Sequence, residues 1–186
     1  MDEPSPTDAD IFTSEQPPLP ILSDRPTTHP GSCLALSLPL LAHFEKLLPE
    51  TPALVLSIGS GAGLLEALLL ARNLRITGVE VSPSPNRYLP PANHETVLGS
   101  RSLHWLADDA RVWLFVYPRR VGLVEDYIRI YGYNEARTVI WIGPTSDWED
   151  YRGLFDHRWH VEDMSAADVG GRAWERIAVA RSVSHM

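Results

Sequence analysis

Three closely spaced glycines form the turn Gly59-Ser60-Gly61-Ala62-Gly63, where a ligand could touch bare backbone. Glycine has no Cβ, so such a turn can adopt positive φ and admit a ligand closely. The apolar run 53–58 before the turn predicts a buried strand, and the Leu- and Ala-rich run 64–72 after it predicts a helix. The start of that helix would offer unpaired N–H groups and a partial positive charge to the ligand.

An acid stands near the end of the next predicted strand, Arg75 to Val81. Parallel neighbouring strands end at the same edge of a sheet, so Glu80 is expected beside the glycine turn. A carboxylate in that place can accept hydrogen bonds from both hydroxyls of a ribose. The turn and Glu80 together predict a nucleoside site. The alternatives are a strand-to-helix turn without a ligand and an acid exposed at a strand end.

The spacing of the glycines separates three classes of ligand site. A phosphate-binding P-loop requires Lys and Ser or Thr after the last glycine, where this chain has Leu64-Leu65. A dinucleotide fingerprint requires a small residue at position 64, and Leu64 would obstruct close packing beside a pyrophosphate. The observed pattern is Gly-x-Gly-x-Gly, which leaves a nicotinamide-dependent oxidoreductase as a minor alternative.

The segment Val55 to Gly63 resembles motif I of the class I S-adenosylmethionine-dependent methyltransferases, and Thr77 to Val81 resembles their second motif. The resemblance covers about 34–181. It implies an α/β, Rossmann-like fold with a mostly parallel seven-stranded sheet, an antiparallel C-terminal strand and helices on both faces. It also implies S-adenosylmethionine as the cofactor.

The resemblance assigns roles to individual residues. Gly59, Gly61 and Gly63 would wrap the methionine part of the cofactor, and Glu80 would hold the ribose. Gly99 and Ser100 would lie near the adenine, and Tyr117 would face the sulfonium and the substrate. The full set of expected cofactor-binding residues is Ser57, Gly59, Ser60, Gly61, Gly63, Glu80, Val81, Gly99, Ser100 and Tyr117.

The chain departs from the family pattern in three places. Ser57 stands where the family usually has an acid, two residues before the first glycine. The proline-rich segment 83–91 replaces a helix that normally flanks the adenine. The corner Val116-Tyr117-Pro118-Arg119 lacks the Asn or Asp acceptor of the enzymes that methylate amino groups. No catalytic residue is assigned.

Two functions follow from these residues. The first is a methyltransferase that acts on a small-molecule or protein substrate, and the alternative is an inactive methyltransferase-like binding or scaffold protein with a protein partner. The net charge of −8 over 186 residues disfavours nucleic acid as the substrate. The lone Cys33, the absence of a long apolar run and the acidic N-terminus predict a protein of the cytoplasm or nucleus, without a membrane anchor.

The histidines do not predict a metal site. His157 and His160 are close in sequence, but on a strand they would point to opposite faces, and no cysteine accompanies them.

The rest of the chain predicts the elements that position these residues. Residues 1–31 are rich in proline and predict a flexible tail, with an extended strap formed by Ile11-Phe12 and Leu19 to Leu22 as the alternative. Residues 32–186 form the methyltransferase-like domain, whose first helix starts late or breaks at Pro39. Strands are expected at 53–58, 75–81, 95–98, 111–117, 138–142, 158–163 and 174–181, and helical stretches at 32–48, 64–72, 102–109, 123–131 and 147–155.

Overall fold

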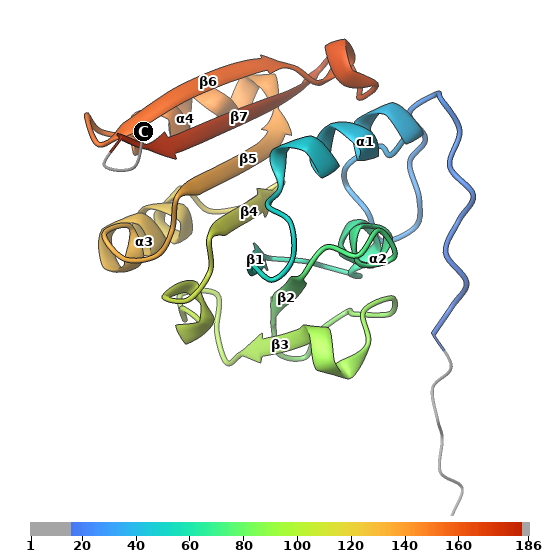
Figure 1. The fold of residues 1–186 in the computed structure, drawn as a ribbon, viewed down its shortest axis with the longest axis horizontal. Helices are drawn as coiled ribbons and strands as arrows, with labels where there is room; N and C mark the ends of the chain where they lie inside the picture. Colours follow the sequence, from blue (N-terminus) through green and yellow to red (C-terminus); the bar gives the residue numbers. More distant parts are fainter. Residues whose placement is uncertain (1–15, 184–186) are drawn as a thin grey trace, which may run out of the picture.

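The computed structural model describes residues 16–183, and its central feature is one seven-stranded β-sheet. The strands are β1 Val55–Ile58, β2 Ile76–Val81, β3 His94–Val97, β4 Val112–Val116, β5 Thr138–Pro144, β6 Trp159–Ser165 and β7 Glu175–Ser182. Across the sheet their order is β3-β2-β1-β4-β5-β7-β6 (Figure 1). The strands β1 to β5 pair in parallel, and β7 runs antiparallel to both β5 and β6. The expected fold class is therefore confirmed.

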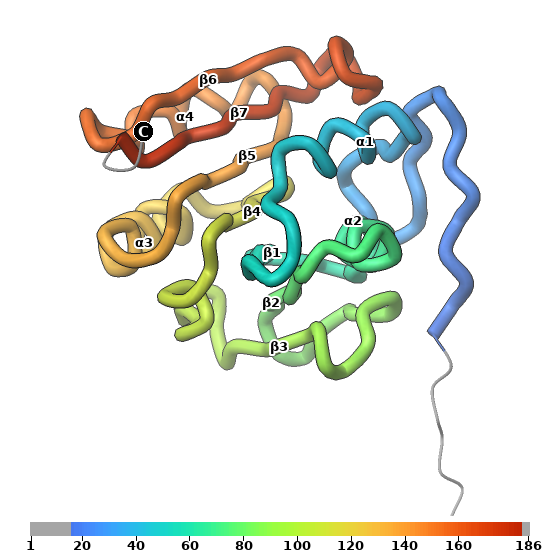
Figure 2. The backbone as a smooth tube through the Cα atoms, in the orientation of Figure 1, coloured from blue at the N-terminus to red at the C-terminus, as the bar shows by residue number. Residues whose placement is uncertain are grey.

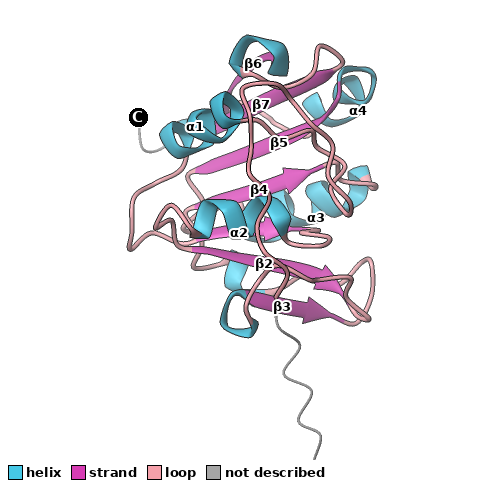
Figure 3. Ribbon diagram, turned by 90° about the vertical axis from the view of Figure 1, so that its right-hand side faces the viewer, coloured by secondary structure: helices cyan, strands magenta, loops and turns pink. Residues whose placement is uncertain are grey.

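Helices cover both faces of the sheet. They are α1 Leu38–Leu47, α2 Leu64–Leu70, α3 Val121–Tyr131 and α4 Trp148–Arg152. Figure 3 shows α1 and α2 in front of the sheet, with α3 and α4 behind it. Single 3-10 turns are η1 Pro91–Asn93, η2 Trp105–Ala107, η3 Thr145–Asp147 and η4 Ala166–Val169. None of the helices within residues 16–183 has the length and apolar character of a bilayer span.

Side chains of the central strands alternate between two buried clusters. Val112 and Leu114 of β4 pack with α1 and α2, whereas Trp113 and Phe115 pack with α3 and α4. This alternation follows from the two-residue period of a strand. Both faces of the central strands are buried, which accounts for their nearly continuous apolar sequences.

The first helix starts late, as expected from Pro39. Ser37 is its N-cap, and the Ser37 hydroxyl accepts a hydrogen bond from the backbone N–H of Leu40 at 3.2 Å. Proline is tolerated in the first helical turn because that turn has no intrahelical partner for its N–H groups. The same hydroxyl donates to the carbonyl oxygen of Gly170 at 2.7 Å, which joins the start of α1 to the loop before β7.

The proline-rich segment forms no α-helix, as its composition predicts, and it packs against the glycine turn instead. The backbone N–H groups of Arg87 and Tyr88 donate to the carbonyl oxygen of Ala62 at 3.0 and 3.1 Å. Leu89 is only 2% exposed. The segment therefore covers one flank of the turn.

The described part of the N-terminal segment runs outside α1 and α2 (Figure 2). Leu22 is buried, whereas Leu19 and Ile21 are exposed. Thr27 and Leu36 exchange two backbone hydrogen bonds of 2.9 Å. The burial of Leu22 agrees with the alternative expectation that this segment packs on the domain as an extended strap. The position of the domain boundary stays a prediction, and Ile11-Phe12 lie outside the described residues.

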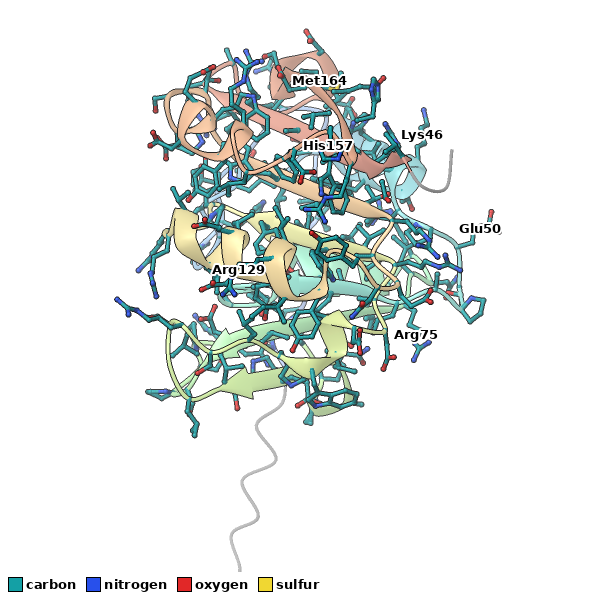
Figure 4. All side chains as sticks on the ribbon, turned by 90° about the vertical axis from the view of Figure 1, so that its left-hand side faces the viewer. Lys46, Glu50, Arg75, Arg129, His157 and Met164 are labelled. Atoms are coloured by element: carbon teal, nitrogen blue, oxygen red, sulfur yellow. The ribbon has the colours of Figure 1, made fainter. Side chains whose placement is uncertain are left out.

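The C-terminal strands form the expected antiparallel pair, but the expected end of the preceding strand was wrong. Gly143 and Pro144 belong to β5, where they pair with Arg176 and Glu175 of β7. Pro144 is the last residue of the strand, and its pairing with Glu175 is the last one between β5 and β7. Figure 4 views the molecule from the side of α3, from which Arg129 extends, and shows His157 on the loop that precedes β6.

We predict that Gly170→Ala lowers the free energy of unfolding by roughly 2–4 kcal/mol, as measured by urea denaturation. Gly170 has a φ of +93°, and an added Cβ would lie 2.7 Å from Pro39 Cβ and 2.8 Å from Ser37 Oγ. Gly153→Ala is the matched control, because Gly153 has right-handed backbone and nothing within 4 Å of an added Cβ. Equal unfolding energies for the two variants would contradict the assigned contact.

Candidate functional site

A cavity of about 740 Å³ lies at the carboxyl ends of β1, β2 and β4. Its size is in the range of small-molecule sites, which is roughly 300–1,000 Å³. In open α/β sheets, ligands bind at this edge of the strands. The walls come from the glycine turn, the end of β2, the loop after β3, the corner after β4 and the N-terminal residues 31–33.

The glycine turn exposes its backbone to this cavity. Gly59 and Gly61 have φ angles of 79° and 56°, which other residues rarely adopt. Nothing lies within 4 Å of a Cβ added at Gly59. At position 59, glycine is therefore required by the positive φ of the backbone and not by a lack of space, because the space in front of it is open.

At Gly63 a side chain is excluded by close neighbours as well as by the backbone conformation. It also has a positive φ, of 78°, but an added Cβ would lie 2.7 Å from Asn86 Oδ1 and 2.9 Å from Leu89 Cγ. It is the N-cap of α2 and does not line the cavity. The third glycine of the motif thus lets the proline-rich segment approach the turn.

Glu80 joins the end of β2 to the glycine turn. Its Oε2 atom accepts a hydrogen bond from the backbone N–H of Gly61 at 2.8 Å, and Oε1 accepts from the N–H of Val81 at 2.7 Å. A carboxylate has about four lone-pair positions, so each oxygen can accept a further hydrogen bond from a ligand hydroxyl. The carboxylate lines the cavity.

The structure brings most of the expected site residues to one cavity. Those that line it are Gly59, Ser60, Gly61, Glu80, Val81, Gly99, Ser100 and Tyr117. Ser57 and Gly63 are outside its lining. Ser57 is 1% exposed in the middle of the sheet, where it pairs with Gly78 of β2 and Leu114 of β4.

The loop after β3 is attached to the start of α3. The Arg120 guanidinium donates to the Ser100 carbonyl oxygen at 2.7 Å and to the Ser100 hydroxyl at 3.1 Å. Both residues line the cavity. This contact fixes the wall at which the resemblance expects the adenine.

Tyr117 lies at the corner after β4 with a strained backbone. Its φ is 50°, an uncommon value for a bulky residue. Its hydroxyl donates to Glu175 Oε1 at 2.8 Å. Burial and this hydrogen bond raise the pKa of Tyr117 well above its usual range, so its side chain stays a neutral phenol. Backbone strain of this kind often occurs at ligand sites.

Glu175 is a buried acid that accepts three hydrogen bonds from the chain. It is 1% exposed at the start of β7. Besides the Tyr117 hydroxyl, it accepts from the backbone N–H of Arg172 at 3.0 Å and from that of Ala35 at 3.4 Å. The N-terminal segment, β4 and β7 are thereby linked beside the cavity.

Glu66 is a second buried acid, and it lines the cavity from the first turn of α2. It is 2% exposed, and its Oε1 atom accepts a hydrogen bond of 2.6 Å from the Ser57 hydroxyl. Burial raises the pKa of Glu66 to about 7, and the nearby Glu80 adds to that shift. A carboxyl group that changes charge near neutral pH therefore lies inside the site.

Three features of the site were not predicted from the sequence. Glu66 was visible as the lone charge within the apolar run 64–71, and that signal was not used. Glu175 had no local signal, because the register of β5 and β7 brings it to Tyr117. The wall formed by Gly31 to Cys33 belongs to the segment around the expected end of the tail.

No group of three His, Cys, Asp or Glu side chains within residues 16–183 is arranged to hold a metal ion. His160 lies on β6 and forms a 3.6 Å pair with Glu162. His157 precedes β6, as the expected strand 158–163 implies, so the two histidines do not share a strand. The strands β4, β5 and β7 separate β6 from β1, which carries the glycine turn.

The strand order and the position of this cavity define the class I methyltransferase fold. No family model matches the sequence, and no curated protein matches it. Solved structures do match, at identities that show the fold alone.

Three of these structures illustrate the likeness. A precorrin-6y C5,15-methyltransferase from Geobacter metallireducens GS-15 has a TM-score of 0.60 and 16% identity, over 88% of this chain and 98% of that chain. A TehB-like SAM-dependent methyltransferase from Corynebacterium glutamicum has a TM-score of 0.53 and 12% identity, over 77% and 87%. The Pyrococcus abyssi tRNA (uracil-54, C5)-methyltransferase, in complex with S-adenosyl-L-homocysteine, has a TM-score of 0.55 and 14% identity, over 76% and 36%.

We predict that Glu66→Gln changes how stability depends on pH. Burial raises the pKa of Glu66 in the folded protein to about 7, from the ordinary glutamate value of 4.5. Between these two pKa values the folded state binds more protons than the unfolded state does. The contribution of Glu66 to the free energy of unfolding of the wild type is therefore present at low pH and is lost as pH rises through about 7. Relative to wild type, the variant should gain on the order of 3 kcal/mol in unfolding free energy between about pH 4 and pH 8. Urea denaturation at several pH values measures this, and a constant difference would contradict it.

Proposed function

We propose that the protein is an S-adenosylmethionine-dependent methyltransferase of the cytoplasm or nucleus, acting on a small molecule or a protein. One observation carries the proposal. The open backbone of the glycine turn and the Glu80 carboxylate lie side by side in one cavity, held by the 2.8 Å hydrogen bond from Gly61. A backbone cradle and an acid on the neighbouring strand are what a nucleoside with an attached aminoacyl chain requires.

The residues present fit this cofactor. Open space in front of Gly59 leaves room for a ligand group to lie against the main chain of the turn. Glu80 has acceptor positions left for the two ribose hydroxyls. Gly99 and Ser100 line the cavity near the end of β3 and would lie beside the adenine. The similarity of the fold to methyltransferases, one of them in complex with S-adenosyl-L-homocysteine, supports the proposal.

The corner after β4 would serve the methyl acceptor. Tyr117, Pro118 and Arg119 line the cavity there. When bound, the cofactor supplies an activated methyl group on its sulfonium. The chain would contribute alignment of the acceptor with that methyl group, which is a proximity effect. Tyr117, fixed by Glu175, is a neutral hydroxyl that can orient an acceptor by a hydrogen bond.

A substrate of low negative charge suits the acidic chain. The net charge of −8 repels nucleic acid at long range, so small molecules and proteins should be tested first. A putative methyltransferase of similar fold was solved in complex with the Haloferax volcanii Trm112 methyltransferase activator. A protein partner is accordingly included in the proposal.

We predict that the wild-type protein binds S-adenosyl-L-homocysteine in calorimetric titration and that Glu80→Ala weakens binding at least about tenfold. Two hydrogen bonds from the ribose to a charged acceptor correspond to roughly that loss or more. Glu125→Gln is the control, because Glu125 is an exposed acid on α3 and its replacement changes the net charge equally. Thermal unfolding of each variant should confirm that it is folded.

The proposed methyltransferase activity is tested by measuring transfer of a labelled methyl group from S-adenosylmethionine to metabolite or protein extracts. Cofactor binding without transfer to any extract would favour the inactive binding protein. Tighter binding of NADH than of S-adenosyl-L-homocysteine would overturn the proposed function.

A further inference from the structure

Two buried acids adjoin the cavity, and their surroundings differ. Glu175 accepts hydrogen bonds from three donors that belong to the chain. Glu66 has the Ser57 hydroxyl at 2.6 Å and its own backbone N–H. Both donors of Glu66 are uncharged, and the residue lines the cavity although it is only 2% exposed.

When Glu66 is ionised, no basic side chain of the described residues balances its negative charge. Within residues 16–183, the charged neighbour that acts on this carboxyl is Glu80, which has the same sign. The rest of α2 is formed by leucine and alanine. A buried carboxylate without a partner is costly, so such a group is commonly paired with a cation. The site therefore has room for a cation that a ligand would bring.

We propose that the Glu66 carboxylate binds the α-ammonium group at the aminoacyl end of the cofactor, with Ser57 as its positioning residue. The proposal rests on the proposed function and assigns a contact at the same site. Glu66 stands in the first turn of α2, directly after the glycine turn, whereas Glu80 stands at the end of β2. The two acids then recognise two different parts of one ligand.

This assignment explains the serine at position 57. Ser57 does not line the cavity, and its hydroxyl instead donates to Glu66. An acid on β1 is therefore unnecessary, because the carboxylate is supplied by the neighbouring helix. The cation is an organic ammonium in this proposal, since the described residues contain no cluster that could hold a metal ion.

The test compares two ligands that differ at the aminoacyl end. S-Adenosyl-L-homocysteine carries the ammonium group, and 5′-methylthioadenosine keeps the nucleoside but lacks it. Calorimetry with wild-type protein and Glu66→Gln should show that the variant binds S-adenosyl-L-homocysteine at least about tenfold more weakly, a typical value for loss of a charged hydrogen bond. Its affinity for 5′-methylthioadenosine should stay within about twofold. Glu125→Gln should bind both ligands as wild type does.

A second variant separates binding from folding. Adding Ser57→Asp to Glu66→Gln returns a carboxylate to the position beside residue 66, and should restore part of the lost affinity for S-adenosyl-L-homocysteine. Equal weakening of both ligands in Glu66→Gln would show a structural role and overturn the inference, as would unchanged affinity for both. If the wild-type protein binds neither ligand, the proposed function itself fails.

Discussion

The hydrogen bond from the Gly61 N–H to Glu80 is the contact on which the site depends. It links the ends of β1 and β2, which are parallel neighbours in the sheet. Its donor is the main chain of a residue that has no side chain, and its acceptor is the Glu80 carboxylate. Because Gly61 follows β1 and Glu80 is the next-to-last residue of β2, the bond joins two walls of the cavity. It also sets a negative charge beside the positive end of α2, which favours this arrangement electrostatically.

The glycine turn is supported from outside by two irregular segments. On one side, the proline-rich segment donates two backbone hydrogen bonds to Ala62 and packs Leu89 against Gly63. On another side, a Cβ at Gly31 would lie 2.7 Å from Ala62 Cβ, so the N-terminal segment passes very close to the turn. These contacts on two sides hold the turn in place.

The order of strands and helices could be predicted from the sequence because it depends on local signals. Apolar runs with turn residues at their ends placed each strand to within a few residues, and Pro39 fixed the late start of α1. The glycine turn and Glu80 were expected at the site from their types and spacing, whereas Gly99, Ser100 and Tyr117 were expected there only from the family resemblance. Contacts between distant parts of the chain could not be predicted in this way. Glu175 reaches Tyr117 only through strand pairing, and Glu66 is a site residue only because α2 packs beside β1.

The N-terminal segment has a consequence for how the protein can be shortened. Gly31, Ser32 and Cys33 form part of the cavity wall, and Leu22, Thr27 and Leu36 hold the chain that leads to them. A chain trimmed to begin at Ser32 would retain every strand and helix of the sheet. It would nonetheless lose Leu22, Thr27 and Gly31, and with them part of the wall of the cavity. Intact secondary structure in a trimmed protein is therefore no guarantee of an intact site.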